Sequence, residues 1–181
     1  MSRLVAVDPA KATGKAKDLL DKVKMKLGVT PNMMRTMANS PAVLEAYLNF
    51  HNALAGGSLS AKLREQIALA VAQTNGCEYC LSAHTAIGEI VGLGRDEILS
   101  SRQSVSTDKK VDAALKFANT IVARTGDVTD ADVNLVRHAG YSDGEIAEII
   151  ANAALNVFTN LFNQATQTEI DFPRVTLRSA A

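Results

Sequence analysis

Apolar residues recur three and four positions apart along most of the chain, which is the spacing of one face of an α-helix. The longest such stripe consists of Ile146, Ile149, Ile150, Ala153, Val157, Phe158 and Leu161. A second contains Ala113, Ala114, Phe117, Ile121 and Val122, and a third, less regular one contains Ala42, Leu44, Ala46, Tyr47 and Leu48. No segment shows the sustained alternation and hairpin turns of a β-sheet. The pattern predicts an all-α fold, a compact bundle of about seven or eight helices.

Prolines, glycines and capping residues indicate where these helices begin and end. Asp8-Pro9, Thr30-Pro31 and Ser40-Pro41 each place a capping residue before a proline, which is favoured at the first helical position. Ser142 with Glu145, and more weakly Thr129 with Asp132, have the spacing of a capping box. Helices are expected to end at Gly28, Gly56-Gly57, Gly76, Gly92, Gly94, Gly126 and Gly140. Residues 1–7 and 174–181 are expected to be extended tails.

Residues 63–72 are apolar on every side of the expected helix, which indicates a helix buried in the core. Glu65 shares a face of this helix with the apolar residues three, four and seven positions later. Because burying an unpaired carboxylate is costly, Glu65 is expected to be paired or functional. The alternative is that it lies near enough to the helix start to reach water, or to pair with Lys62 or Arg64.

The segment that carries chemistry follows this helix. Asn75-Gly76 ends it, and Cys77 falls at the start of the next helix, where free backbone N–H groups favour a thiolate. Cys77, Cys80 and His84 fall within a ~60° arc of one helix face. Cys80 and His84 are four residues apart, so the imidazole can take the proton of the thiol. The alternative is that the cysteines and the histidine are structural residues.

Glu65 can join this group only if the chain turns back. On one continuous helix, Glu65 would lie ~18 Å from Cys77. If the chain reverses at Gly76, Glu65 and His84 come within ~5 Å of each other along the axis. The spacing therefore predicts a proton relay from Cys80 through His84 to Glu65, with a Glu65–His84 contact at ~2.6–3.2 Å.

Composition and charge narrow the setting of this chemistry. Nearly half of the 181 residues are apolar, so one domain over residues 1–181 can bury a sizeable core. Lysine plus arginine equals aspartate plus glutamate, 19 each, and no basic stripe suggests a nucleic-acid or membrane partner. The longest purely apolar run, residues 67–72, is too short to span a bilayer. Residues 1–8 lack the features of a secretory signal, so a cytoplasmic location is expected.

The number and spacing of the cysteines also indicate the kind of chemistry. The chain has two cysteines, three residues apart, whereas a secreted disulfide framework has more, and more widely spaced, cysteines. A structural zinc site needs four good ligands, and here two thiols have one histidine nearby. We therefore expect reversible thiol redox chemistry, with no cofactor and no metal.

The pattern E-x11-C-x-x-C-x3-H, formed by Glu65, Cys77, Cys80 and His84, resembles the core of a known family. Within the region 60–92, the sequence NGCEYCLSAHT is similar without gaps to the alkylhydroperoxidase D-like (AhpD-like) branch of the carboxymuconolactone decarboxylase superfamily. Two features depart from the type enzyme. Tyr79 stands where that enzyme has an additional histidine, and the motif lies in mid-chain rather than near the C-terminus.

The resemblance implies an all-α fold that assembles into homo-oligomers, as trimers or trimers of dimers, and that reduces a hydroperoxide substrate with a thiol. It implies that Cys80 attacks the peroxide, that Cys77 resolves the product, and that His84 and Glu65 relay the proton. An unidentified thiol or dithiol would be the reductant. The start of a helix favours Cys77 as the low-pKa thiol, whereas His84 and the resemblance favour Cys80, which we take as the attacking residue.

Three other functions stay open at this point. One is a general dithiol–disulfide oxidoreductase without a preference for peroxides. The second is the carboxy-lyase activity on a lactone that gives the superfamily its name, although this chemistry does not need paired cysteines. The third is a metal-binding or purely structural helical module. Outside the motif, His51 and His138 are expected to be structural or surface residues. Met33, Met34 and Met37 are expected in the core, with a pocket lining as the alternative.

Overall fold

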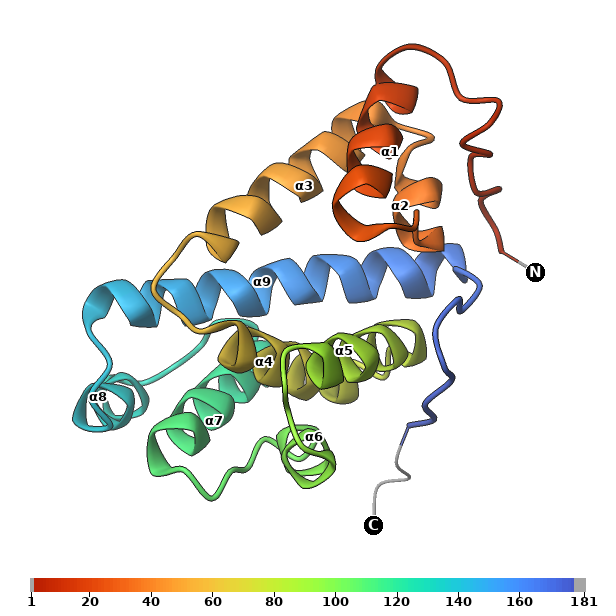
Figure 1. Ribbon diagram of the computed structural model, residues 1–181. Helices are drawn as coiled ribbons and strands as arrows, with labels where there is room; N and C mark the ends of the chain where they lie inside the picture. Colours follow the sequence, from red (N-terminus) through yellow and green to blue (C-terminus); the bar gives the residue numbers. More distant parts are fainter. Residues whose placement is uncertain (1, 178–181) are drawn as a thin grey trace.

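A computed structural model describes residues 2–177, and in this part of the chain all regular secondary structure is helical (Figure 1). The helices are α1 (Gly14–Leu27), α2 (Asn32–Met37), α3 (Pro41–Ala55), α4 (Ala61–Thr74), α5 (Glu78–Ile90), α6 (Arg95–Ser101), α7 (Lys109–Ala123), α8 (Asp130–His138) and α9 (Asp143–Thr166). The all-α prediction is confirmed. The nine helices of the described residues exceed the seven or eight expected because α2 and α6, of 6 and 7 residues, are too short to show a periodic stripe.

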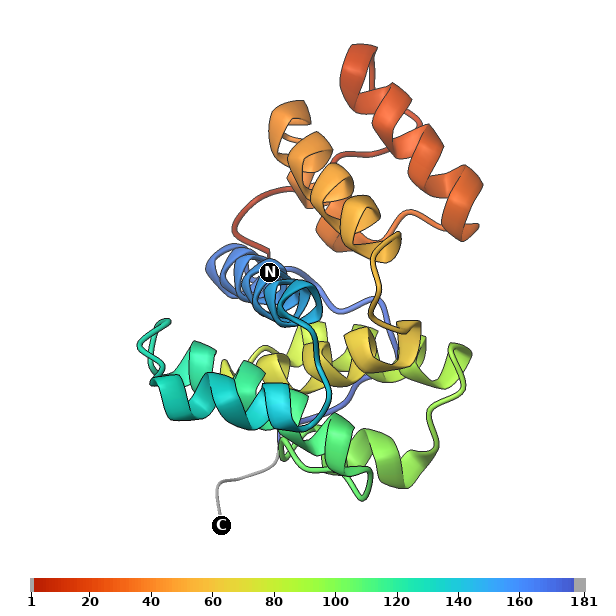
Figure 2. The ribbon, with the colours of Figure 1, turned by 90° about the vertical axis from the view of Figure 1, so that its left-hand side faces the viewer.

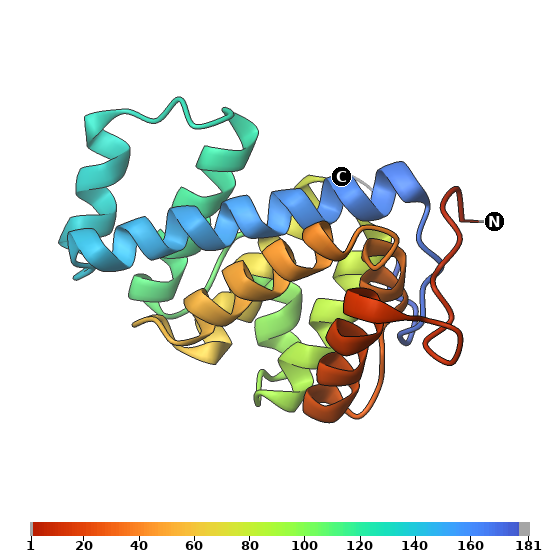
Figure 3. The same cartoon turned by 90° about the horizontal axis from the view of Figure 1, so that it is seen from above.

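The longest helix, α9, crosses the molecule with other helices on two sides (Figures 1 and 2). Helices α1, α2 and α3 lie on one side of it. Helices α4, α5 and α7 lie on the other, with α6 beyond them. Seen from above, α3 runs beside α9 (Figure 3). Helix α4 packs against α5, α7 and α9, so it is surrounded by other helices as its apolar sequence predicts.

Helix α4 also joins the two hydrophobic clusters of the core. Its Ile67 and Val71 belong to a cluster with residues of α7, α8 and α9. Its Leu69 and Ala72 belong to a second cluster, which contains residues of α1, α2 and α3 together with Cys77 and Cys80. The dithiol motif therefore begins at the end of a helix that is packed on several sides, which fixes its position.

Several helix boundaries agree with the sequence prediction. Ser142 and Thr129 each accept a hydrogen bond from the backbone N–H three residues later, and each lies in a capping box. Gly28 ends α1 in the left-handed conformation, with φ of 76°. Pro41 is the first residue of α3, although the Ser40 side chain makes no capping hydrogen bond.

Three boundary predictions were wrong. Asp8-Pro9 begins only a short turn, because the Asp8 side chain accepts a hydrogen bond from Ala10 N–H and its carbonyl accepts from the two following N–H groups. The first helix instead starts at Gly14. Pro31 precedes α2 as its capping residue rather than lying within it. Gly94 precedes α6 rather than ending a helix, because Glu97 accepts a hydrogen bond from its N–H.

The chain outside the helices is extended at both ends, as expected for the parts of residues 1–7 and 174–181 that the structure describes; residues 1 and 178–181 lie outside it. After α9 the chain turns back along α5, where Val175 N–H donates to Ser82 Oγ at 3.0 Å. Between residues 2 and 177, no helix is long and apolar enough to cross a membrane.

The apolar stripe on α9 describes only half of that helix correctly. Ile146, Ile149 and Ala153 are buried as expected. Ile150, Phe158 and Leu161, in contrast, are 42%, 40% and 63% exposed. Apart from Leu155, the buried face of the C-terminal half consists of polar residues, Asn156, Thr159, Asn160, Asn163 and Thr166. Asn163, on this polar face, lies against the dithiol motif.

Candidate dithiol site

A sharp reversal between α4 and α5 positions the two cysteines. Gly76 adopts a φ of 68°, a left-handed conformation that favours glycine. Cys77 then makes the N-cap of α5, and its N–H donates to Ala72 O at 2.9 Å, which ties the new helix to the end of the old one. Cys80 and His84 follow on α5 one helical turn apart. The predicted reversal at Gly76 is confirmed.

The reversal brings Glu65 of α4 against His84 of α5. The distance from Glu65 Oε2 to His84 Nδ1 is 2.7 Å, within the range predicted from the spacing. The two side chains are 16% and 21% exposed, so the pair is largely removed from water. Arg64, the alternative partner of Glu65, donates instead to Leu59 O at 2.6 Å. The predicted Glu65–His84 contact is confirmed.

The carboxylate determines the protonation of the imidazole. Burial opposes a charge on His84, but the negative charge of Glu65 and its hydrogen bond outweigh burial and raise the pKa of His84. Because an ionised carboxylate only accepts hydrogen bonds, Nδ1–H donates to Glu65, and Nε2 is left for another partner. Glu65 therefore favours the protonated form of His84, one turn from Cys80.

The two thiols differ in acidity. Burial opposes ionisation of Cys80, but a hydrogen bond from Cys77, the charge of His84 and the amides of Asn163 and Asn160 together lower its pKa to about 7. The hydrogen bond to Cys80 and burial both raise the pKa of Cys77. The helix-start argument, which favoured Cys77 as the low-pKa thiol, is therefore wrong about the pKa order. Cys77 Sγ, at the N-cap, does accept a hydrogen bond from the Cys80 N–H at 3.3 Å. However, the imidazole of His84 is one turn from Cys80 and two turns from Cys77, so it favours the thiolate of Cys80 more.

Two asparagines of α9 complete the surroundings of Cys80, and the sequence analysis missed both. Asn163 Nδ2 donates to Cys80 Sγ at 3.3 Å and lies 3.2 Å from the sulfur of Met33. Asn160 is fully buried, and its Oδ1 accepts a hydrogen bond from Asn75 Nδ2 at 2.9 Å. Asn160 Nδ2 makes no hydrogen bond of good geometry in the described structure, although its amide is among the groups that lower the pKa of Cys80. Asn163 Oδ1 has no hydrogen-bond partner in the described structure.

Buried polar atoms without partners are rare, and here two of them belong to side chains that lie beside Cys80. A signal for these residues exists in the sequence. Asn152, Asn156, Asn160 and Asn163 follow one another at spacings of four, four and three, which places four amides on one helix face.

Tyr79, which replaces the additional histidine of the type enzyme, is a packing residue here. It is buried, its Oη accepts Met33 N–H at 3.1 Å, and its ring meets the Phe172 ring edge-on at 5.8 Å. Burial raises the pKa of Tyr79, so the hydroxyl stays protonated at neutral pH. The side chain fixes α2 and the C-terminal segment against the dithiol motif.

The other histidines and methionines fit their expected roles in part. His138 is exposed and its Nδ1 bonds to Asn134 O at 2.7 Å. His51 lies at the surface, with its ring centroid 5.9 Å from that of Tyr47. Met33 and Met37 are buried in the core, and Met33 also reaches the site through Asn163. Among residues 2–177, no three His, Cys, Asp or Glu side chains are grouped so that they could hold a metal ion.

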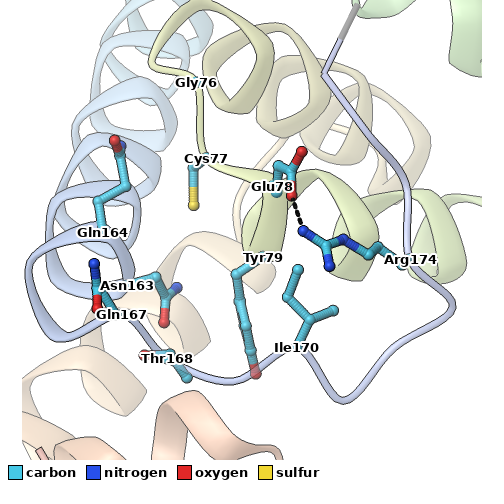
Figure 4. A pocket seen from close by; sticks show the side chains of 10 residues that line it. All are labelled: Gly76, Cys77, Glu78, Tyr79, Asn163, Gln164, Gln167, Thr168, Ile170 and Arg174. Atoms are coloured by element: carbon cyan, nitrogen blue, oxygen red, sulfur yellow. Dashed lines mark hydrogen bonds and ion pairs between the residues drawn. The ribbon is translucent and has the colours of Figure 1, made fainter. Parts of the chain in front are cut away.

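A pocket of about 490 Å³ opens beside Cys77, between the start of α5, the end of α9 and the C-terminal segment (Figure 4). The Cys77 sulfur is directed into the space between Tyr79 and Asn163. At one side of the pocket, Arg174 forms an ion pair of 2.7 Å with Glu78. The other side is formed by the last turn of α9, which contributes Gln164.

Comparisons with known proteins agree with this fold. Residues 41–123 match the model of the carboxymuconolactone decarboxylase family. No curated protein is significantly similar to the chain. Among solved structures, an uncharacterized peroxidase-related protein of Ralstonia eutropha JMP134, described as an alkylhydroperoxidase AhpD core, has a TM-score of 0.83 and 26% identity. The match covers 94% of this chain and 92% of that one.

Two further structures share the fold at lower identity. An uncharacterized peroxidase-related protein of Silicibacter sp. TM1040 has a TM-score of 0.82 and 24% identity, over 93% of this chain and 91% of that one. The debrominase Bmp8, as a cysteine-to-alanine variant in complex with 2,3,4-tribromopyrrole, has a TM-score of 0.80 and 20% identity, over 94% and 92%.

Fold and site together define an all-helical protein with a buried dithiol and an adjacent histidine–glutamate pair. Over residues 41–123 the chain matches the carboxymuconolactone decarboxylase family, and its fold is similar to that of solved AhpD-like, peroxidase-related proteins.

Proposed function

We propose that this protein is a thiol-dependent peroxidase that reduces hydroperoxides with the Cys77–Cys80 dithiol. The observation that carries the proposal is the contact of 2.7 Å between Glu65 and His84, one helical turn from a cysteine whose pKa is lowered to about 7. At neutral pH about half of Cys80 is thiolate, which is the nucleophilic form of cysteine.

The reaction consists of two steps. The Cys80 thiolate attacks the terminal oxygen of the hydroperoxide, the O–O bond breaks, and the alkoxide leaves with a proton as an alcohol. The product is a sulfenic acid on Cys80. The Cys77 thiol then attacks the Cys80 sulfur and displaces water, and a disulfide forms. The oxidant gains two electrons, and the protein loses two hydrogens.

Each residue of the site has a part in this scheme. His84, held by Glu65, stabilises the thiolate and is placed to supply the proton to the departing oxygen. Asn163 donates to Cys80 Sγ, so it stabilises the negative charge on that sulfur. Cys77, whose pKa is raised, remains a thiol and donates a hydrogen bond to Cys80 until it is needed as the resolving residue.

Two alternative functions predict different behaviour at the same cysteines. A general dithiol–disulfide oxidoreductase would exchange with protein disulfides as readily as it reacts with peroxide. A carboxy-lyase acting on a lactone would keep its activity when both cysteines are replaced. The acidity of Cys80 and its surrounding donors favour the thiol reaction over the carboxy-lyase.

The test is to treat the fully reduced protein with one equivalent of cumene hydroperoxide and to measure its intact mass. We expect the mass to fall by ~2 Da as the disulfide forms, and an equal amount of alcohol to appear. The same measurement with 2,3,4-tribromopyrrole compares the peroxide with the compound bound to the related debrominase. Unchanged free thiols after prolonged exposure to hydroperoxide would contradict the proposed function.

A further inference from the structure

The pocket beside Cys77 borders one side of the dithiol site. Its lining includes Cys77 and Asn163, but it does not include Cys80, His84 or Glu65. The Cys77 residue is 1% exposed, and its sulfur points into the pocket (Figure 4). The resolving cysteine therefore has an approach of its own, separate from the Glu65–His84 pair.

The walls of this pocket fit a small, uncharged molecule. Tyr79 and Ile170 supply apolar surface, and Gln164 and Thr168 supply uncharged polar groups. The two charged residues, Glu78 and Arg174, neutralise each other through their ion pair of 2.7 Å. The volume of about 490 Å³ lies within the range of ~300–1,000 Å³ that is usual for small-molecule sites.

The chemistry of disulfide exchange also favours attack by a reductant on the Cys77 sulfur. A thiolate that attacks a disulfide displaces the sulfur that is the better leaving group, which is the one with the lower pKa. The charge of His84 and the donor Asn163 stabilise a thiolate on Cys80. Attack on Cys77 therefore expels Cys80 into surroundings that are prepared for its negative charge, whereas attack on Cys80 would expel Cys77 without them.

We propose that this pocket admits a low-molecular-weight, slender thiol that reduces the Cys77–Cys80 disulfide by attack on the Cys77 sulfur. The inference rests on the proposed function, since the peroxide reaction produces the disulfide. The incoming thiolate forms a mixed disulfide with Cys77, and Cys80 leaves as a thiolate. A second thiol of the reductant attacks the mixed disulfide at the reductant's own sulfur. The oxidised reductant leaves as a disulfide, and Cys77 takes up a proton.

The shape of the site argues against a thiol that is fixed on a protein surface. Cys77 lies at the floor of the pocket, and the C-terminal segment runs along one side. Val175 N–H of this segment donates to Ser82 Oγ at 3.0 Å, and Phe172 packs on Tyr79. A reductant has to reach past these residues, which a free thiol does more easily than a folded protein.

The test measures the reduction of a preformed disulfide, so it is independent of any peroxide. Diamide oxidises the dithiol of the wild-type protein and of three variants, and the rate of reduction by dithiothreitol is followed by the return of free thiols. Gln164→Trp fills the pocket from α9 and should slow the reduction about tenfold or more. Gln164→Ala removes the same amide and its hydrogen bond to Asn75 O without adding bulk, so it should slow the reduction much less than Gln164→Trp does. Gln103→Trp makes the same substitution at an exposed position after α6, outside the pocket lining, and it should stay near the wild-type rate.

Two further measurements on the wild-type protein keep the proposal falsifiable if Gln164→Trp fails to fold. After brief reaction with 2-mercaptoethanol and acid quenching, fragment mass spectrometry should locate the mixed disulfide on Cys77. Thioredoxin, which carries its dithiol on a protein surface, should reduce the disulfide more slowly than dithiothreitol at equal concentration. An adduct on Cys80, faster reduction by thioredoxin, or an undiminished rate in folded Gln164→Trp would each overturn the proposal.

Discussion

The N-terminal half of α9 buries Ile146, Ile149 and Ala153 in a hydrophobic cluster, whereas its C-terminal half buries Asn160 and Asn163 against the dithiol motif. The first half also buries one amide, Asn152, whose Nδ2 donates to Glu148 O at 2.8 Å. The second half leaves the Asn163 amide oxygen without a partner in the described structure, and such a group costs about 1–3 kcal/mol. In the proposed function, one continuous helix therefore stabilises the fold at one end and supports thiol chemistry, at a cost in stability, at the other.

The same contrast separates the two cysteines. Cys80 receives a hydrogen bond from Asn163 and the charge of His84, and its pKa is lowered. Cys77 is held at the N-cap of α5 with its pKa raised. The buried amides and the imidazole thus make two neighbouring thiols chemically different, which a dithiol enzyme with a defined attacking residue requires.

Removal of either thiol should have the largest effect on the reaction with hydroperoxide. We expect Cys80→Ser to abolish reaction with hydroperoxide, because Cys77 stays protonated. Cys77→Ser should retain one stoichiometric oxidation, to a sulfenic acid that no second thiol resolves. Trapping with dimedone and intact mass measurement distinguishes the two products. The assignment would be reversed if Cys80→Ser formed the dimedone adduct and Cys77→Ser did not.

Replacement of the relay carboxylate should have the next largest effect. Glu65→Gln preserves size but removes the charge that raises the pKa of His84, so His84 loses its proton at a lower pH. The Cys80 thiolate then loses an adjacent cation. We expect oxidation to slow by ~10–1,000-fold near neutral pH. The difference should shrink above the pKa of Cys80, where the thiol ionises without help.

This prediction is measured as a pH profile of the oxidation rate by stopped-flow fluorescence or thiol quenching, with circular dichroism as the control for folding. A wild-type rate in Glu65→Gln across the whole pH range would remove Glu65 from the relay and leave a site of two cysteines and one histidine.

The prediction from sequence succeeded where the geometry is local. Glu65 and His84 are joined by two helices and one glycine, so counting residues to the break at Gly76 was enough to place them in contact. Asn163 is 83 residues from Cys80, and its contact depends on how α9 packs across α4 and α5. Periodicity indicated that α9 is amphipathic but assigned Phe158 to the buried face. A pattern of apolar residues treats every asparagine as exposed, so it cannot predict that asparagines are buried beside a thiol.

The two halves of α9 should respond oppositely to substitution. Asn163→Leu removes a donor to Cys80 and a buried oxygen without a partner in the described structure. We expect it to leave the free energy of unfolding unchanged or higher while the peroxide rate at pH 7 falls about tenfold, the effect of one pKa unit. Ile149→Ala, in the apolar half, should lower the free energy of unfolding by ~2–5 kcal/mol and leave thiol reactivity unchanged.

Urea unfolding and peroxide kinetics on the same two variants test this contrast. Equal loss of stability in both, or a normal peroxide rate in Asn163→Leu, would show that the buried asparagines are structural residues.

Substitution on the outward face of α9 should have the smallest effect on thiol reactivity. Ile150, Phe158 and Leu161 are 42%, 40% and 63% exposed and lie on one side of the helix. We propose that this face contributes to a homo-oligomer, a trimer or a trimer of dimers. Light scattering at micromolar concentration should give a multiple of the 19.2 kDa chain mass. Phe158→Asp should reduce the oligomer mass with little effect on the rate of disulfide formation, and a monomeric wild-type protein would contradict the proposal.

The ionisation of Cys80 itself tests the central claim most directly. In Cys77→Ser the thiolate absorbance at 240 nm reports a single cysteine, and the tyrosines do not interfere because burial raises the pKa of Tyr47, Tyr79 and Tyr141. The serine hydroxyl keeps a hydrogen-bond donor beside Cys80. We predict a titration midpoint near pH 7. A midpoint at or above the ordinary value of 9.0 would contradict the proposed role of Cys80.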